Sequence, residues 1–310
     1  MGEPDPVVVG VGAARSSWDA LDWAAAEAAT RGCPLRIVSA CTPPVAPGPF
    51  APVADLGGPG GAATDALLQE AAERARTVAS ELVVTTRAVI GGPVAALTCQ
   101  PAQLLVVGTC APGPVRSALV GSVSVAVSSR AACPVVVVPP RREVAPGPSR
   151  ARVVVGVDGT DLSAPAVGVA LSAAVQRGIG LTAVHAWTPR PPADVGGIGD
   201  DWVAAEAVAR HRLAAALTPW RRRFPDVDVR LTPVPDDPAR ALAEESAGAA
   251  LVVVGARGRG CLTGALFGSV SQAVLRHASC PAVVVRPTTA TTGRVRAARA
   301  RPRSHDRGGT

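Results

Sequence analysis

Short continuous runs of valine, leucine and isoleucine alternate along the chain with alanine-rich segments whose apolar residues recur about one turn apart. Such apolar runs are typical of parallel strands buried on both faces, and the spacing between them predicts helices. In the second half of the chain the pattern predicts five strands, near Val153–Val157, Leu181–Ala186, Val227–Leu231, Leu251–Val254 and Ala282–Val285. We therefore expect an α/β fold, with helices filling the intervals between parallel strands.

The ends of two of these helices can also be predicted. Ser163 is a suitable N-cap for the helix after the first strand, and Gly178 is a suitable stop. The apolar residues from Trp202 to Leu217 predict the next helix. The first half of the chain repeats this pattern, with a longer proline- and glycine-rich loop, "PPVAPGPFAPVADLGGPGG", before its second helix.

The two halves of the chain are copies of one domain. "VVVGVGAARSS" at Val7 is echoed by "VVVGVDGTDLS" at Val153, and "VGSVSVAVSSRAACPVVVV" at Val120 by "FGSVSQAVLRHASCPAVVV" at Phe267. Because order and spacing agree, we assign one domain to residues 1–140 and a second to 151–287. The intervening residues 141–150 have the proline, glycine and charge of an exposed linker.

The positive charge of the chain is concentrated at its C-terminal end. Of the formal net charge of +7, residues 288–310 contribute +5, from six arginines and one aspartate. This composition offers no core, so we expect a disordered arginine-rich tail. The rest of the chain is nearly neutral, which makes nucleic acid an unlikely partner for the folded domains.

Cysteine usage and hydropathy bear on the compartment. The seven cysteines form no CxxC pair, which favours neither a zinc site nor a disulfide framework. The longest apolar runs fall far short of a membrane span, so no membrane association is expected. We expect a cytoplasmic protein.

The stretch "GARGRGCLTGALFGS", Gly255 to Ser269, follows the fourth predicted strand of the second domain. Glycines let backbone N–H groups approach an anion, and a helix that starts at Gly268–Ser269 would direct its positive dipole end at the same place. The loop is neither a Walker A motif nor a dinucleotide fingerprint, because GxxxxGK[ST] is absent and the glycines do not follow the first strand. It is therefore either a phosphate cradle or a glycine-rich surface connection without function.

Here the sequence resembles a known family. Gly255-xx-Gly258, followed after nine residues by Gly268-Ser269, is similar to the G-2x-G-9x-G-[ST] pattern of nucleotide-binding universal stress proteins, and "VVVGVDGT" resembles their first strand. The resemblance covers both copies and implies two tandem, open five-stranded parallel-sheet domains with helices on both faces, of the adenine nucleotide alpha hydrolase-like class. It also implies pairing of the two domains through their last strands, "CPVVVV" and "CPAVVV", and leaves further homo-oligomer formation open.

The resemblance implies ATP as the ligand of the second domain, with or without Mg²⁺. Asp158 would lie near the adenine and ribose and Ala186 against the base, while the glycines and Ser269 would hold the phosphates and ribose. The full set of implied contacts is Gly156, Val157, Asp158, Ala186, Val254, Gly255, Gly258, Gly268, Ser269, Val270 and Ser271. The alternatives are structural: Asp158 would initiate a turn, and Ser269 would cap a helix.

The first copy departs from the pattern. Gly12 stands in place of Asp158, Ala111 in place of Gly258, and "APGP" places two prolines in the loop, which removes N–H donors. Gly108, Gly121 and Ser122 are retained, and the helix before the fourth strand is two residues shorter. We expect a degenerate site in a domain that serves as a structural partner.

No catalytic constellation is recognisable, and efficient phosphoryl transfer would need a metal-bearing acid and a base beyond Asp158. We expect a protein that is not an enzyme, with slow ATP hydrolysis left open. We expect His185 to be a core residue, and Cys133 and Cys280 to be small buried groups rather than redox sensors. Arg257 and Arg259 either reach phosphates or are solvated. Two functions remain: an ATP-responsive stress regulator with an unknown protein partner, or a nucleotide-independent structural or nucleic-acid-associated adaptor that uses the basic tail.

Overall fold

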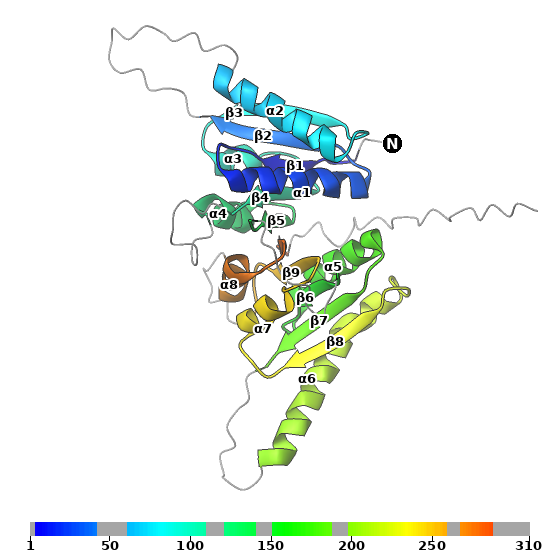
Figure 1. Cartoon of the computed structure of the whole chain (residues 1–310). Coiled ribbons are helices and arrows are strands. Elements are labelled where there is room, and N and C mark those ends of the chain that lie inside the picture. Colours follow the sequence, from blue (N-terminus) through cyan, green and yellow to red (C-terminus); the bar gives the residue numbers. More distant parts are fainter. Residues whose placement is uncertain are drawn as a thin grey trace, which may run out of the picture.

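A computed structural model of the chain describes residues 4–41, 61–109, 121–140, 151–187, 198–258 and 267–287. The first domain alternates strands and helices in the predicted way (Figure 1). Its elements are β1 (Val7–Gly10), α1 (Arg15–Arg31), β2 (Leu35–Cys41), α2 (Ala62–Val78), β3 (Val84–Ile90), α3 (Pro93–Thr98), β4 (Leu104–Gly108), α4 (Ser122–Arg130) and β5 (Val135–Val138).

The second domain repeats this order. Its elements are β6 (Val153–Gly156), the 3-10 turn η1 (Asp161–Ser163), α5 (Ala164–Arg177), β7 (Leu181–Ala186), α6 (Ile198–Arg221), β8 (Val229–Val234), α7 (Pro238–Glu245), β9 (Leu251–Gly255), α8 (Ser269–His277) and β10 (Ala282–Val285). Helix α7 has eight residues where its counterpart α3 has six, which confirms the shorter helix expected in the first domain.

The strands of both domains form one ten-stranded sheet in the order β3-β2-β1-β4-β5-β10-β9-β6-β7-β8. All pairings are parallel except the central one, where β5 and β10 run antiparallel with Val136 opposite Val283. The predicted pairing of the domains through their last strands is therefore confirmed. Because the junction is antiparallel, the carboxyl ends of the strands lie at opposite edges of the sheet in the two domains.

Helices cover both faces of this sheet, as expected for strands that are apolar throughout (Figure 1). Successive strand residues point to opposite faces, so that Val7 and Val9 pack with α1 and α2, whereas Val8 faces α3 and α4. Helices α5 and α6 continue the first layer and α7 and α8 the second. The core is therefore two apolar layers, one on each side of the shared sheet.

The two domains also meet through a buried acid on α1. Glu27 is only 4% exposed and lies between two arginines, Arg31 of its own helix and Arg177 of α5. Its Oε1 accepts from Arg31 Nε at 2.7 Å, and its Oε2 accepts from Arg177. The repeat makes these arginines equivalent, with Ala173 at the position of Glu27 in the second domain. One carboxylate therefore links both repeats.

Several predicted boundaries were wrong. Strand β6 ends at Gly156 rather than Val157, and β9 ends at Gly255 rather than Val254. The strand expected at Val227–Leu231 is β8, Val229–Val234, which continues through Pro233 because an edge strand tolerates a residue without an N–H. The helix expected over Trp202–Leu217 runs from Ile198 to Arg221, with Pro219 in its last turn. Ser163 precedes α5 but does not cap it, because its hydroxyl donates to the Thr160 carbonyl, and Thr160 caps η1 instead.

Other predictions concern the remaining segments. Gly178 ends α5 in a left-handed conformation, as expected. The long loop of the first domain up to residue 60, the linker 141–150 and the tail 288–310 lie outside the described residues. Within the described part of the chain, no helix is both long enough and apolar enough to cross a bilayer.

Candidate functional site

The candidate site lies where the strand order of the second domain reverses. Strands β6 and β9 are neighbours, although two strands and their helices separate them in sequence, and both end at the same edge. Open α/β sheets bind ligands in the crevice at this place. Gly156 ends β6 and packs so closely against α7 that an added Cβ would lie 2.9 Å from Leu242 Cδ1. Gly255 ends β9, and Ala186 ends the adjacent strand β7.

Asp158 follows β6 and is held by the turn that it begins. Its Oδ1 accepts hydrogen bonds from the Thr160 backbone N–H at 2.9 Å and from the Thr160 hydroxyl at 2.7 Å. Its Oδ2 is buried and has no hydrogen-bond partner in the described part of the structure. A buried carboxylate oxygen without a donor is costly, so this atom is suited to a ligand that brings an O–H or N–H group.

Thr160 was not predicted as a site residue, although it fixes the orientation of Asp158. The sequence signal was the spacing Asp-x-Thr directly after a strand, because short polar side chains in turns bond to the backbone two residues away. Turn initiation and ligand contact are therefore compatible in Asp158: one carboxylate oxygen makes the turn, and the other remains free.

The glycine loop after β9 returns towards this aspartate. A Cβ built on Gly258 would lie 3.4 Å from Asp158 Oδ2, so that the loop backbone and the free carboxylate oxygen border the same space. Gly255 has little room for a side chain either, with the Arg257 carbonyl 3.1 Å from a Cβ at that position. Arg257 itself is exposed, while residues 259–266, including Arg259, lie outside the described residues.

Helix α8 begins at this loop, as predicted. The Gly268 N–H donates to the Ala256 carbonyl at 2.8 Å, which fixes the helix start beside the end of β9. The next residue, Ser269, is exposed, and no partner for its hydroxyl is found among the described residues. Ser271 is buried, and its hydroxyl donates to the Gly268 carbonyl at 2.8 Å. Ser269 thus has a hydroxyl proton available to a ligand, whereas Ser271 uses its proton to hold the turn.

The apolar members of the predicted set pack into the core. Val157 and Val254 are buried on opposite faces of the sheet, and Val270 of α8 is partly buried against the same layer as Val254. His185 is also buried, with Nδ1 2.6 Å from the Val157 carbonyl, as expected of a core histidine. Of these residues, Val157, Val254 and Val270 can contribute to a ligand site chiefly through their backbone.

The corresponding place in the first domain is built differently. Gly12 carries no acid, and its carbonyl accepts from the Ser17 hydroxyl at 2.7 Å, which also donates to Ala14. A Cβ on Gly108 would lie 2.1 Å from the Ser16 carbonyl oxygen of α1, whereas the matching distance at Gly255, to Leu162, is 3.6 Å. Helix α1 is therefore packed more closely on the strand end.

A hollow of about 200 Å³ persists beside Gly12 in the first domain. Its described walls are largely apolar, with Val38, Leu97 and Val107 among them. The hydroxyl of Ser124 at its side already donates to the Gly108 carbonyl at 2.9 Å. Residues 110–120, with Ala111 and both prolines, lie outside the described residues. The described part thus lacks the carboxylate that distinguishes the second domain.

Two equivalent cysteines precede the last strands. Burial raises the pKa of the Cys133 thiol to about 11 and that of Cys280 to about 12, because desolvation disfavours the thiolate. At neutral pH both thiols are protonated and act as small apolar groups. Cys99, at the end of α3, is exposed.

These cysteines should differ in their rate of alkylation. The thiols of Cys133 and Cys280 stay protonated below about pH 11 because their pKa values are raised. Iodoacetamide at pH 8 is therefore expected to modify the exposed Cys99 in the native protein, and to modify Cys133 and Cys280 only after the chain is unfolded. Peptide mass spectrometry after timed quenching measures this order. Modification of Cys280 at the rate of Cys99 in the native chain would contradict its protected state.

Comparison with known proteins agrees with the repeat. The model of the universal stress protein family matches residues 4–139 and again 150–286. A universal stress protein of Mycobacterium tuberculosis is 40% identical over 290 residues, which cover 90% of this chain and 96% of that protein. A second, from Mycolicibacterium smegmatis, is 35% identical over 295 residues, covering 91% and 97%. The crystal structure of a universal stress protein from Archaeoglobus fulgidus shares the fold, with a TM-score of 0.61, 18% identity, and coverage of 91% of this chain and 98% of that one.

Proposed function

Because the chain belongs to the universal stress protein family, we propose that it binds ATP in its second domain and acts as a nucleotide-responsive regulator. Occupancy of the site would change the surface around the glycine loop and α8, and a partner protein would recognise that surface. The observation that carries the proposal is the free, buried Oδ2 of Asp158, which lies beside the backbone of Gly258.

The described groups fit the chemistry of a nucleotide. The Asp158 carboxylate can accept a hydrogen bond from a ribose hydroxyl or from the adenine amino group. The glycine backbone, the start of α8 and the Ser269 hydroxyl are suited to phosphate oxygens, since N–H groups and the helix dipole favour negative charge. Mg²⁺, if it accompanies ATP, would be held mainly through the phosphates.

We propose binding rather than turnover as the main activity. Hydrolysis of ATP would need a base that orients water and an acid that carries the metal. Asp158 is the acid at the site, and Thr160 holds one of its two oxygens in the turn. ATP would then serve as a signal whose presence changes the surface of the protein.

The test is the nucleotide content of the purified chain together with one substitution. Mass spectrometry should find a bound adenine nucleotide, and Gly258→Val should lower ATP affinity at least about a hundredfold, because the added isopropyl group would crowd Asp158 Oδ2 and displace the backbone donors. Calorimetry measures the affinity, and thermal unfolding confirms the fold.

The matched control is Gly12→Ala at the equivalent turn of the first domain. Nothing lies within 4 Å of a Cβ at that position, so neither the fold nor ATP affinity should change. Undiminished affinity of the Gly258→Val chain would remove the basis for the proposed site. A chain that carries no nucleotide and binds none would favour the nucleotide-independent adaptor instead.

A further inference from the structure

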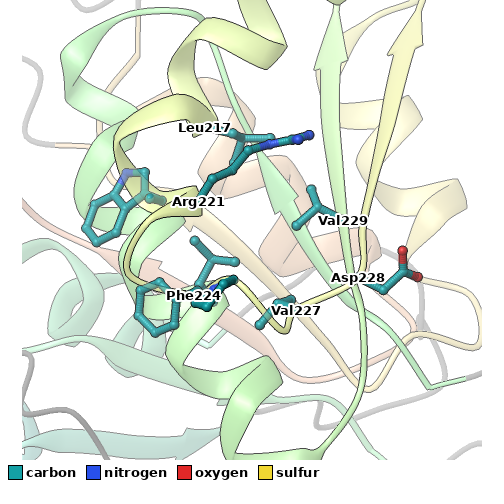
Figure 2. A pocket seen from close by; sticks show the side chains of 9 residues that line it. Leu217, Arg221, Phe224, Val227, Asp228 and Val229 are labelled. Atoms are coloured by element: carbon teal, nitrogen blue, oxygen red, sulfur yellow. The ribbon is translucent and has the colours of Figure 1, made fainter.

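A hollow of about 380 Å³ lies in the second domain, away from the candidate nucleotide site. Its walls come from the end of α6, the loop that follows, and the first residues of β8 (Figure 2). Since β8 begins at Val229, this hollow lies at the amino ends of the parallel strands, whereas Asp158 and Gly258 lie at their carboxyl ends. A ligand here would leave the nucleotide site free.

The inner wall of the hollow is made of closely packed apolar side chains. Leu171 of α5 and Leu217 of α6 are buried, and the rings of Trp220 and Phe224 lie 6.2 Å apart at 31°. Trp220 is seated against α5 at Gly168, where an added Cβ would be 2.5 Å from the indole ring. The volume falls within the range of about 300 to 1,000 Å³ that small-molecule sites occupy.

The charges at the mouth of the hollow favour an anion. Arg221 extends from α6 towards β8, and its guanidinium has no hydrogen bond or ion pair with any described residue (Figure 2). The one acid that lines the hollow, Asp228, points away from it and pairs with Arg152 at 2.6 Å. Arg222 and Arg223 follow directly in the chain, and Asp226 lies in the loop after them. The local field is therefore positive, with one unpaired arginine beside an apolar wall.

We propose that this hollow binds a small aromatic carboxylate. Its ring would lie against the apolar wall that Trp220 and Phe224 border, and its carboxylate would pair with Arg221. A guanidinium can donate two parallel hydrogen bonds to one carboxylate. Pairs of aromatic rings also attract each other more strongly than their buried area alone would predict. The two charged ends of the neighbouring Arg152–Asp228 pair are already satisfied, so they do not compete for the ligand.

The probe is 2-naphthoate, titrated into the intact chain by calorimetry. At the binding energy per atom usual for small ligands, its Kd should be about 1 mM or below. The uncharged 2-naphthalenemethanol should bind about tenfold more weakly because it lacks the carboxylate. Octanoate should also bind more weakly because it lacks the ring. Saturating ATP should leave the Kd of 2-naphthoate unchanged, since the sites lie at opposite edges.

The variant Arg221→Gln should reduce 2-naphthoate affinity about tenfold and leave the affinity of the alcohol unchanged. Arg222→Gln is the matched control, because Arg222 is the next residue and does not line the hollow. Val227→Phe should fill the hollow and abolish binding of 2-naphthoate, with ATP affinity as the check that the domain is folded.

Three results would overturn the proposal. The first is absence of saturable 2-naphthoate binding at millimolar concentration. The second is equal binding of the alcohol or of octanoate, which would remove the carboxylate or the ring from the recognition. The third is an equal loss of affinity in Arg221→Gln and Arg222→Gln, which would reduce the effect to general surface charge.

Discussion

Titration of the intact chain with ATP is expected to saturate at one nucleotide per chain, and the variant with both Asp158→Ala and Gly258→Val is expected to bind none. The expectation follows from the two turns compared above. Asp158 presents a free buried carboxylate oxygen, whereas Gly12 presents a backbone carbonyl that Ser17 already occupies. Each lost hydrogen bond to a charged group costs about 1.5 to 3 kcal/mol, so a site that lacks the acid and several donors should be weaker by orders of magnitude.

Calorimetry gives the stoichiometry directly, and the Gly12→Ala chain serves as the reference that should still bind one ATP. A stoichiometry near two would show that the first domain is active despite the close packing of α1 on Gly108. Tight binding that survives the double substitution would place the active site in the first domain instead. Both outcomes would reverse the assignment of roles to the two repeats.

Replacement of Glu27 by alanine is expected to lower the free energy of unfolding by about 3 kcal/mol, the lower end of the range for breaking a buried ion pair. The carboxylate side chain is 3% exposed, while the side chains of Arg31 and Arg177 are 16% and 18% exposed. Because the arginines keep some contact with water, their loss of a partner should cost less than it would in a dry core. Urea denaturation measures the change.

The control for Glu27→Ala is Glu206→Ala on α6. Glu206 pairs with Arg210 at 2.9 Å, but both side chains are about half exposed, so the loss should be below about 1 kcal/mol. Added salt should reduce the contribution of the exposed pair more than that of the buried one. If Glu27→Ala costs no more than Glu206→Ala, the buried pair does not hold the domains together.

The sequence predicted those parts of the fold that depend on local pattern and on repetition. Short, mostly apolar runs buried on both faces marked the strands Leu181–Ala186 and Ala282–Val285 with their observed ends. The repeat itself predicted equivalent last strands, and their antiparallel pairing is observed. Edge strand β8 was placed two residues early at its start because Val227 continues the apolar pattern, although it packs in a loop.

Details of the site depended on contacts that no local pattern specifies. The two carboxylate oxygens of Asp158 have different environments. One accepts a hydrogen bond from the backbone of Thr160, and the other has no partner in the described part of the structure and lies beside the returning loop at Gly258. The role of Glu27 was not predicted, because an acid in an alanine-rich helix looks like a solvated residue until Arg177 is brought beside it from 150 positions away. The hollow beside Trp220 likewise requires α5, α6 and β8 to be assembled.

Because Glu27 is present in the first repeat only, the two repeats pair as two different subunits of a heterodimer would, within one polypeptide. A homodimer requires a self-complementary surface, so every residue near its axis occurs twice. Fusion removes that requirement: the first repeat supplies the acid, and the second has Ala173 at the matching position. Two copies of the second repeat would set each Arg177 opposite an alanine and leave it without its carboxylate. The second repeat therefore favours the first repeat over a copy of itself as its partner, which frees the two nucleotide regions to diverge.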